Sequence, residues 1–262
     1  MFGARGRGQN MVVLAVVKFG GSFISEKSRK FSVRKRAVQA AFQALSNTRF
    51  VLVHGGGSFG HPVASEYGLS GMNTSTSRKG VWETRSAMQR LNDIICQAMA
   101  KSGLKPYVVP GVAILDTELR VRPGIKDTLD IISNSGLTPV SYGDVLPVVG
   151  GFRIVSGDYL SLTLCSLMQP RRMVFVLDKP GILKDPQDDE SLVRRVEPDE
   201  LESFGHGGSH DVTGGFKYKL KIAKEIAGLG VETAFVSGFN GDALIKSVLG
   251  GPFKGTLVVS KK

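Results

Sequence analysis

Apolar runs that end in glycine turns constrain the fold of this chain more than any other feature. Residues 12–19 form a mostly apolar, β-branched run that ends in Gly-Gly-Ser at 20–22. Residues 50–54 form a second such run, which leads into Gly-Gly-Gly-Ser-Phe-Gly-His at 55–61. A run without polar alternation is typical of a strand that is buried on both faces. The chain is therefore predicted to contain a parallel sheet with a tight turn after each of these strands.

Helical spacing fills the intervals between the predicted strands. Helices are expected at 32–46, 77–101, 126–135, 158–168, 214–227 and 242–249, and further strands at 107–109, 145–149, 173–177, 232–236 and 256–260. This alternation predicts an α/β fold, in which helices cover both faces of a mainly parallel sheet. The 262 residues suit one domain at 11–262 that follows a disordered basic tail at 1–10.

The formal net charge of +11 makes a basic nucleic-acid-binding module one alternative function. The excess is concentrated at the start of the chain, because residues 1–36 hold nine Lys and Arg against one Glu, and the rest hold 25 against 22 Asp and Glu. This alternative would depend on Arg5, Arg7 and the cluster at 29–36. A uniformly basic surface is not predicted, and we expect no nucleic-acid partner.

Cysteine usage and hydropathy favour a soluble cytoplasmic protein without membrane association. Cys96 and Cys165 lie in apolar helical patterns without CxxC spacing, which predicts buried thiols in a reducing compartment. The apolar run at 11–17 follows a basic start, as in a signal peptide. It is short, however, and leads directly into Lys18 and a glycine turn. No stretch approaches the roughly 20 apolar residues of a membrane helix.

The glycine turns have the composition of phosphate sites. Glycine lets backbone N–H groups approach phosphate oxygens, and a following helix adds partial positive charge. Residues 55–60 also match the dinucleotide pattern GxGxxG, but the region about 20 residues later, Ser-Arg-Lys-Gly at 77–80, lacks the acidic residue that this pattern requires. A Walker A motif is excluded as well, because His61 and Pro62 stand where Lys and Ser or Thr are needed.

A third glycine turn occurs at 211–216, where Asp-Val-Thr-Gly-Gly-Phe precedes Lys217, Lys219 and Lys221. Three such turns, together with Lys18, Lys27 and one of these lysines, predict two facing phosphate sites. That arrangement suits phosphoryl transfer, in which the protein aligns donor and acceptor and stabilises the charge between them. The nearby pair His206 and His210 suggests a metal site, but no further ligand accompanies it, and no metal ligand is assigned.

Taken together, these motifs resemble the amino acid kinase superfamily over essentially the whole chain from residue 12 onward. The resemblance rests on Lys-Phe-Gly-Gly-Ser at 18–22, the stretch at 54–61, Ser-Gly-Asp at 156–158 and Asp-Val-Thr-Gly-Gly at 211–215. The segments 20–27 and 55–61 are similar to the isopentenyl phosphate kinase branch. His61 distinguishes this branch, and the similar fosfomycin kinases, from aspartate, glutamate and uridylate kinases.

The resemblance implies a three-layer αβα sandwich whose residues from about 11 to 170 bind the acceptor and from about 171 to 262 bind MgATP. It implies that Lys18 and Lys27 contact the transferring phosphate and that Asp158 orients the lysines, although Asp158 could also cap its helix. The residues that would hold the acceptor phosphate are Gly56, Gly57, Gly60, His61 and Gly157. Those that would bind ATP are Lys18, Gly20, Gly21, Ser22, Asp178, Gly181, Gly215 and Lys219.

Two departures from the family pattern affect the nucleotide side. Relatives often read Thr-Asp-Val-Asp-Gly where this chain has Leu-Asp-Lys-Pro-Gly at 177–181, so the second aspartate is missing. Phe216 replaces the usual methionine, which is an exchange of one apolar residue for another. The predicted ATP contacts on this side therefore include one aspartate, Asp178, where the family pattern has two.

The function implied by the resemblance is ATP- and Mg²⁺-dependent phosphorylation of isopentenyl phosphate to isopentenyl diphosphate, a step of isoprenoid precursor synthesis, in a homodimer. A kinase of another small phosphate or phosphonate, such as fosfomycin, is the nearest alternative. An isopentenyl tail requires an apolar wall near the acceptor phosphate. The predicted helix at 77–101 is the nearest candidate in sequence, with Val81, Trp82, Met88 and Leu91 as its expected wall residues.

Overall fold

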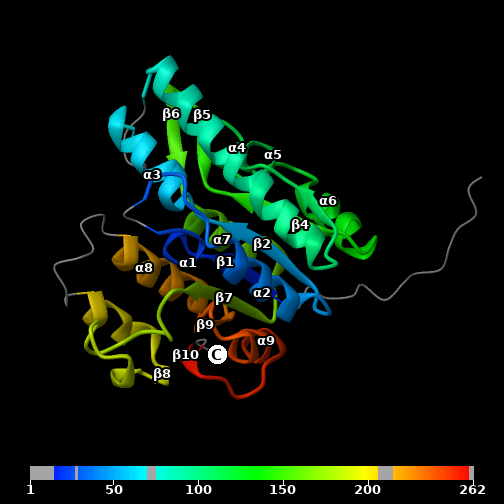
Figure 1. The fold of residues 1–262 in the computed structure, drawn as a ribbon. Coiled ribbons are helices and arrows are strands. Elements are labelled where there is room, and N and C mark those ends of the chain that lie inside the picture. The colour runs from blue at the N-terminus through cyan, green and yellow to red at the C-terminus, as the bar shows by residue number, and fades with distance from the viewer. Residues whose placement is uncertain (1–14, 27–28, 70–74, 206–214, 260–262) are drawn as a thin grey trace, which may run out of the picture.

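The computed structural model describes residues 15–26, 29–69, 75–205 and 215–259. These residues form an eight-stranded sheet with the order β3-β4-β2-β1-β7-β9-β10-β8 (Figure 1). Among these described strands, every neighbouring pair is parallel except β9 with β10, so the predicted mainly parallel sheet is confirmed. The strands are β1 (Ala15–Phe19), β2 (Phe50–His54), β3 (Pro106–Val108), β4 (Thr138–Tyr142), β7 (Arg172–Leu177), β8 (Arg195–Val196), β9 (Glu232–Ser237) and β10 (Gly255–Val258).

Helices cover both faces of this sheet and bury two large apolar clusters against it. One face carries α1 (Gly21–Ile24), α2 (Lys35–Leu45), α3 (Gly57–Glu66), α4 (Arg78–Lys101) and α9 (Gly241–Leu249). The other face carries α5 (Gly111–Ile114), α6 (Ile125–Asn134), α7 (Gly157–Met168), α8 (Gly215–Gly228) and the 3₁₀ segment η2 (Pro198–Gly205). The three-layer αβα sandwich is therefore confirmed (Figure 1).

Strand β1 lies between β2 and β7, and this position determines where the glycine turns meet. Phe19, its last residue, is in register with His54 of β2 and with Val176 of β7. Because the three strands are parallel, their carboxyl ends lie at the same edge of the sheet. The turns that follow these strands are consequently neighbours.

Alternation along β1 directs one charged side chain toward the α7 and α8 layer. Val17 and Phe19 pack into the cluster with α1, α2 and α4, whereas Val16 packs into the cluster with α6, α7 and α8. Side chains two positions apart in a strand share a face. Lys18 therefore shares the face of Val16 and points toward α7 and α8.

A hairpin outside the main sheet adds a third, smaller apolar cluster. Strands β5 (Asp144–Val148) and β6 (Gly151–Val155) pair antiparallel, and Ser75 forms an isolated bridge with Phe152. The cluster consists of Ala64, Leu69, Val81 and Val145, with Tyr67, Phe152 and Ile154 packed against it. It joins α3, α4 and the hairpin at the side of the molecule where Figure 1 shows these elements together.

The structure also contains elements that the sequence did not predict. Strand β4 was missed because Pro139 argues against a central strand, since proline lacks the N–H that a ladder uses. Helix α3 begins at Gly57, inside the stretch 55–61 that was expected to be a turn. Strand β6 and the four-residue helices α1 and α5 were missed as well.

The prediction that both cysteines are buried thiols is confirmed for Cys165 and is wrong for Cys96. Cys165 is buried, whereas Cys96 is half-buried, and both are free thiols. Burial raises the pKa of Cys96 to about 11. The predicted tail at 1–10 lies outside the described residues. Within the described part of the chain, no helix has the length and apolar character needed to cross a membrane.

Candidate active site

A buried cluster of two lysines and one aspartate lies at the carboxyl end of β1. The Asp158 carboxylate is 2.8 Å from Lys18 Nζ and 3.0 Å from Lys219 Nζ, both measured to Oδ1. Lys18 comes from β1, Asp158 from α7 and Lys219 from α8. Each of these three residues is at most 8% exposed to solvent. The fold thus assembles three of the predicted catalytic residues at one point.

Local structure explains why each of these side chains faces the cluster. The Ser156 hydroxyl caps α7 by accepting from the Tyr159 N–H over 3.1 Å, so the alternative that Asp158 caps this helix is wrong. The Asp158 carboxylate is therefore available to both lysines. On α8, Lys219 is buried whereas Lys217 is exposed, because two helical positions differ by about 200° around the axis.

The cluster has more positive than negative charge. Burial lowers the pKa of Lys18, and the neighbouring Asp158 opposes this shift. Burial also disfavours ionisation of Asp158, but the two lysines prevail and hold the pKa of that carboxyl well below its ordinary value. One carboxylate cannot neutralise two ammonium groups. The site therefore favours an additional anion, such as a phosphate oxygen, over a neutral ligand.

The glycine turns after β1 and β2 touch each other through their backbones. A Cβ on Gly21 would lie 2.8 Å from Gly57 Cα, and a Cβ on Gly20 would lie 2.8 Å from the Val176 carbonyl oxygen. At the start of α7, a Cβ on Gly157 would lie 2.9 Å from the His54 carbonyl oxygen. Glycine is needed at these positions because any side chain would separate the turns. Glycine at these positions thus allows the backbone segments around the lysine cluster to pack closely together.

The part of the chain that contains these turns and lysines matches the model of one protein family. The model described as the amino acid kinase family matches residues 13–237. The chain belongs to the amino acid kinase family.

Curated relatives of this amino acid kinase include several isopentenyl phosphate kinases. The enzyme of Methanocaldococcus jannaschii is 30% identical over 236 residues, which cover 81% of this chain and 87% of the relative. The enzyme of Thermoplasma acidophilum is 33% identical over 213 residues, which cover 79% of this chain and 84% of the relative. The resemblance to the isopentenyl phosphate kinase branch is therefore confirmed.

Solved structures give the same result for the fold of this amino acid kinase. A product complex of the T. acidophilum isopentenyl phosphate kinase superposes with a TM-score of 0.76 at 28% identity, covering 93% of this chain and 99% of the other. A substrate complex of an isopentenyl phosphate kinase gives a TM-score of 0.73 at 27% identity, covering 93% of this chain and 98% of the other.

In this amino acid kinase, Met88 of α4 lies directly beneath the second glycine turn. Its Sδ would be 3.3 Å from a Cβ on Gly56 and 2.6 Å from a Cβ on Gly60. Met88 is 2% exposed and Leu91 is fully buried. The glycines at 56 and 60 therefore have a packing reason in addition to their predicted phosphate role. Met88 and Leu91 were predicted to line the tail pocket, and the structure places both in the buried core.

The remaining predicted site residues are distributed around this cluster, and their roles stay predictions. His61 is exposed on α3, and Ser22 is half-buried on α1. Asp178 is exposed directly after β7, and Gly215 is exposed at the start of α8. Gly181 instead packs against β10, because a Cβ there would lie 2.6 Å from Thr256 Oγ1. The following lie outside the described residues: Lys27, the histidines at 206 and 210, and the turn at 211–214.

Sequence reasoning missed His54, which is fully buried at the end of β2. Its Nδ1 lies 3.2 Å from the Gly55 carbonyl oxygen, and its Nε2 lies 3.2 Å from the Asn92 side-chain amide. The ring stacks on Tyr142 with centroids 5.3 Å apart. Burial lowers the pKa of His54 to about 4, so the ring is neutral, and its single N–H donates either to the Gly55 carbonyl oxygen or to Asn92 Oδ1. A histidine that ends a buried strand directly before a glycine turn was the signal available in the sequence.

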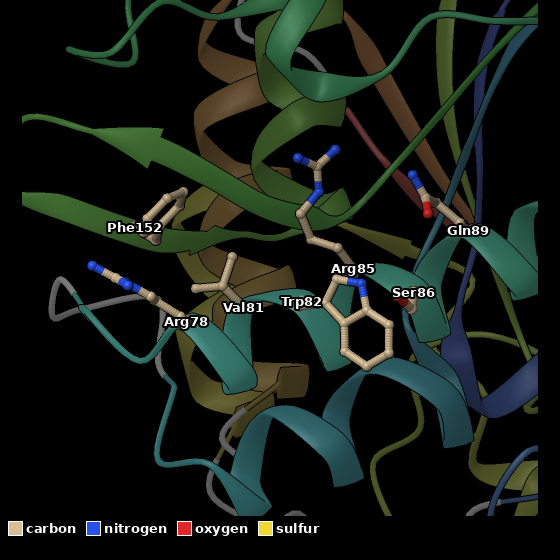
Figure 2. A pocket seen from close by; sticks show the side chains of 7 residues that line it. All are labelled: Arg78, Val81, Trp82, Arg85, Ser86, Gln89 and Phe152. Atoms are coloured by element: carbon tan, nitrogen blue, oxygen red, sulfur yellow. The ribbon is translucent and has the colours of Figure 1, made fainter.

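An open groove of about 350 Å³ lies on α4 beside the hairpin. Its walls include Val81 and the half-buried Arg85, and Figure 2 shows the exposed Trp82 ring on the same helix and Phe152 across from Arg78. Arg85 is paired at 3.2 Å with the buried Asp144, whose pKa burial raises to about 6. Of the four predicted tail-wall residues, Val81 and Trp82 thus line an open space.

Proposed function

We propose that this protein transfers the terminal phosphoryl group of ATP to isopentenyl phosphate, giving isopentenyl diphosphate and ADP. An oxygen of the acceptor phosphate forms a bond to the γ-phosphorus, and the bond from that phosphorus to the bridging oxygen of ADP breaks. The observation that carries the proposal is the buried cluster of Lys18, Asp158 and Lys219 beside the touching glycine turns. The similarity to isopentenyl phosphate kinases supports this acceptor.

The reaction needs charge compensation more than proton transfer. The acceptor phosphate is already largely anionic near neutral pH, so the main obstacle is repulsion between two phosphates. Lys18 and Lys219 are held by Asp158 beside the turns and would stabilise charge on the migrating group without reorganisation. Lys27 and His61 are proposed to contact the transferring and acceptor phosphates, respectively.

Mg²⁺ would accompany ATP and offset further phosphate charge. Within the described part of the chain, no group of three or more His, Cys, Asp and Glu side chains could hold a metal ion. Asp158 is already engaged by two lysines. Magnesium characteristically keeps several waters and binds substrate phosphates with only one or two carboxylates. The charge arrangement therefore fits a metal held chiefly by nucleotide phosphates, and we assign it no protein ligand.

The third apolar cluster supports an acceptor with a hydrocarbon tail. Ala64 lies one helical turn after Gly60, and the cluster continues through Val81 and Val145. Burying about five carbons provides roughly 3 to 4 kcal/mol that a phosphate cradle alone does not supply. A hydrocarbon tail is proposed to lie against this cluster, and the similarity to isopentenyl phosphate kinases supports isopentenyl phosphate over the small polar phosphonate fosfomycin. Dimethylallyl phosphate has the same number of carbons and is expected to react as well.

The acceptor and the nucleotide are proposed to bind to different parts of the chain, which meet at the central strand β1. Residues from about 11 to 170 would bind the acceptor, because they contribute the turn after β2 and helices α3 and α4. Residues from about 171 to 262 would bind the nucleotide, because they contribute β7, its following turn and α8. A homodimer and a cytoplasmic location are further parts of the proposal, testable by light scattering and by fractionation.

A coupled assay of ADP release tests the proposed reaction. Wild-type protein is supplied with MgATP and, separately, with isopentenyl phosphate, dimethylallyl phosphate, fosfomycin, UMP, aspartate and glutamate. Turnover is expected with the two prenyl phosphates. Turnover with fosfomycin alone would replace the acceptor by a phosphonate, and turnover with only the last three would overturn the proposal. A Lys219→Met variant serves as the low-activity control.

A further inference from the structure

One buried hydroxyl joins the two glycine turns that flank the lysine cluster. Ser25 Oγ donates to the Gly21 carbonyl over 3.0 Å and accepts from the Ser58 N–H over 2.8 Å. Gly21 follows β1, whereas Ser58 lies in the first turn of α3, after β2. Ser25 is 1% exposed, so bulk water does not compete for either bond.

Helix α3 depends on this hydroxyl because it has no cap of its own. Its N-cap residue is Gly56, which makes no side-chain hydrogen bond to the helix. The N–H of the second or third helical residue is normally satisfied by an N-cap side chain. Ser58 is the second residue of α3, and Ser25 supplies the oxygen from a different element. A Cβ on Gly57 would lie 2.4 Å from Ser25 Oγ, so glycine at 57 makes room for this contact.

Ser25 is itself fixed to the turn after β1. It ends α1, and its N–H donates to the Gly21 carbonyl over 3.0 Å. Arg34 Nη1 donates to the carbonyl oxygens of Ser25, Phe23 and Ser22. The start of α1 is held by the Gly20 N–H, which donates to the Val176 carbonyl of β7 over 2.8 Å. Because α1 is anchored at both ends, Ser25 transmits the position of the β1 turn to α3.

We infer that Ser25 is a positioning residue for phosphoryl transfer, whose hydroxyl sets the spacing between the turn after β1 and the N-terminus of α3. This inference rests on the proposed function, in which these two turns hold the ATP and acceptor phosphates. Displacing one turn by about 1 Å disturbs in-line alignment and can lower the rate about 100-fold. Binding of each substrate alone depends on one turn at a time and is less affected. Loss of the hydroxyl therefore lowers kcat more than it raises either KM.

Four variants test the inference. Ser25→Thr keeps the hydroxyl, Ser25→Cys replaces it with a weak acceptor, and Ser25→Ala removes it. Ser247→Ala is the matched control, because Ser247 is also fully buried and its hydroxyl also donates to a backbone carbonyl, that of Leu244, over 2.7 Å on α9. We expect kcat to fall about 10- to 100-fold in Ser25→Ala, less in Ser25→Cys and least in Ser25→Thr. Each KM should change less than threefold, and the control should keep near-wild-type kcat.

The outcomes separate positioning from a general loss of stability. If Ser25→Ala and Ser247→Ala lower the melting temperature by the same amount and also lower kcat by the same factor, the inference is overturned. If Ser25→Ala does not fold, the Thr and Cys variants decide, and a Cys variant with wild-type kcat overturns it. If the wild-type protein turns over no prenyl phosphate, the proposed function fails instead. The inference is then tested by amide hydrogen exchange at residues 57–60, where at least threefold faster exchange in Ser25→Ala than in Ser247→Ala supports the link between the turn after β1 and α3, and equal exchange overturns it.

Discussion

Lys219 Nζ lies 3.0 Å and 3.1 Å from the two carboxylate oxygens of Asp158, although the two residues are 61 positions apart in the sequence. This pairing selects one lysine from the three that follow the last glycine turn. We expect Lys219→Met to lower kcat about 10²- to 10³-fold, as loss of one group that stabilises transition-state charge does. Lys217→Met removes an exposed cation and should be much milder. Steady-state kinetics with saturating MgATP compares the two, and a reversed order would refute this role for Lys219.

His61 is expected to recognise the acceptor phosphate by donating a hydrogen bond and not to act as a base. His61→Ala should cost roughly 1.5 to 3 kcal/mol in kcat/KM for the acceptor. His61→Asn and His61→Gln retain a donor and should recover part of this loss, which a general base would not permit. The measurement is kcat/KM for isopentenyl phosphate in all three variants. Equal inactivity in three folded variants contradicts the prediction.

The tail pocket is expected beside Val81, where α4 contributes to both the third apolar cluster and the open groove. Val81→Ala or Trp82→Ala should lengthen the available space and raise kcat/KM for a ten-carbon prenyl phosphate relative to isopentenyl phosphate. Leu91→Ala is the control, because Leu91 is fully buried in the main core and its truncation should lower stability by about 2 to 5 kcal/mol without changing this ratio. An unchanged ratio in both test variants would place the pocket elsewhere.

Burial of His54 makes the stability of the protein depend on pH. Its folded pKa of about 4 lies below the ordinary value of 6.5, so the unfolded chain takes up the proton first. The stabilisation of the folded state that comes from neutral His54 is fully present above pH 6.5. It is lost as the pH falls toward 4, by at most about 1.4 kcal/mol per pH unit. Lys18 and the stacked Tyr142 face the ring and remain in a His54→Gln variant.

Urea unfolding at several pH values between 7 and 4.5 measures this effect. The stability advantage of wild type over His54→Gln should shrink as the pH falls. Asp144 has the opposite effect on stability, because its pKa is raised from the ordinary 3.8 to about 6 in the folded state. The folded state therefore holds this proton more tightly, and the resulting stabilisation is present below pH 3.8 and is lost as the pH rises to about 6. Both proteins contain Asp144, so its effect cancels in the comparison. A constant difference across the range would contradict the prediction.

Sequence patterns were sufficient to predict most of the strands and helices that form the three layers of this fold. Long apolar runs and helical spacing predicted strands such as β2 at its observed residues and placed α4 to within one residue of its start, where the Ser77 hydroxyl caps the helix. They failed at β4, where Pro139 lacks a ladder donor, and at α3, where glycine has a low helix propensity. The start of α3 depends on a cap from Ser25, 33 positions away from Ser58, and no local pattern reveals such a contact.

The candidate site was predictable to the extent that its chemistry is local. Glycine turns and the lysines near them are visible in the sequence, and the family resemblance implied that Asp158 orients lysines. The pairing of Lys219 with Asp158 was found only in the structure. Contacts between distant segments were not visible. Met88 lies under Gly56 and Gly60 because α4 packs against α3, and that packing depends on the whole layer.

The place of β1 between β2 and β7 also has a consequence for how the chain is synthesised. Until residues 172–177 have left the ribosome, β1 has only one partner strand and presents an open edge to other chains. Lys18 also lacks its ion-pair partner until Asp158, which lies 140 positions later in the sequence, has been synthesised. A nascent chain whose emerged part ends before residue 158 would therefore carry both an unpaired sheet edge and an uncompensated ammonium group, and chaperone capture is expected to fall once residues 158 and 172–177 have emerged.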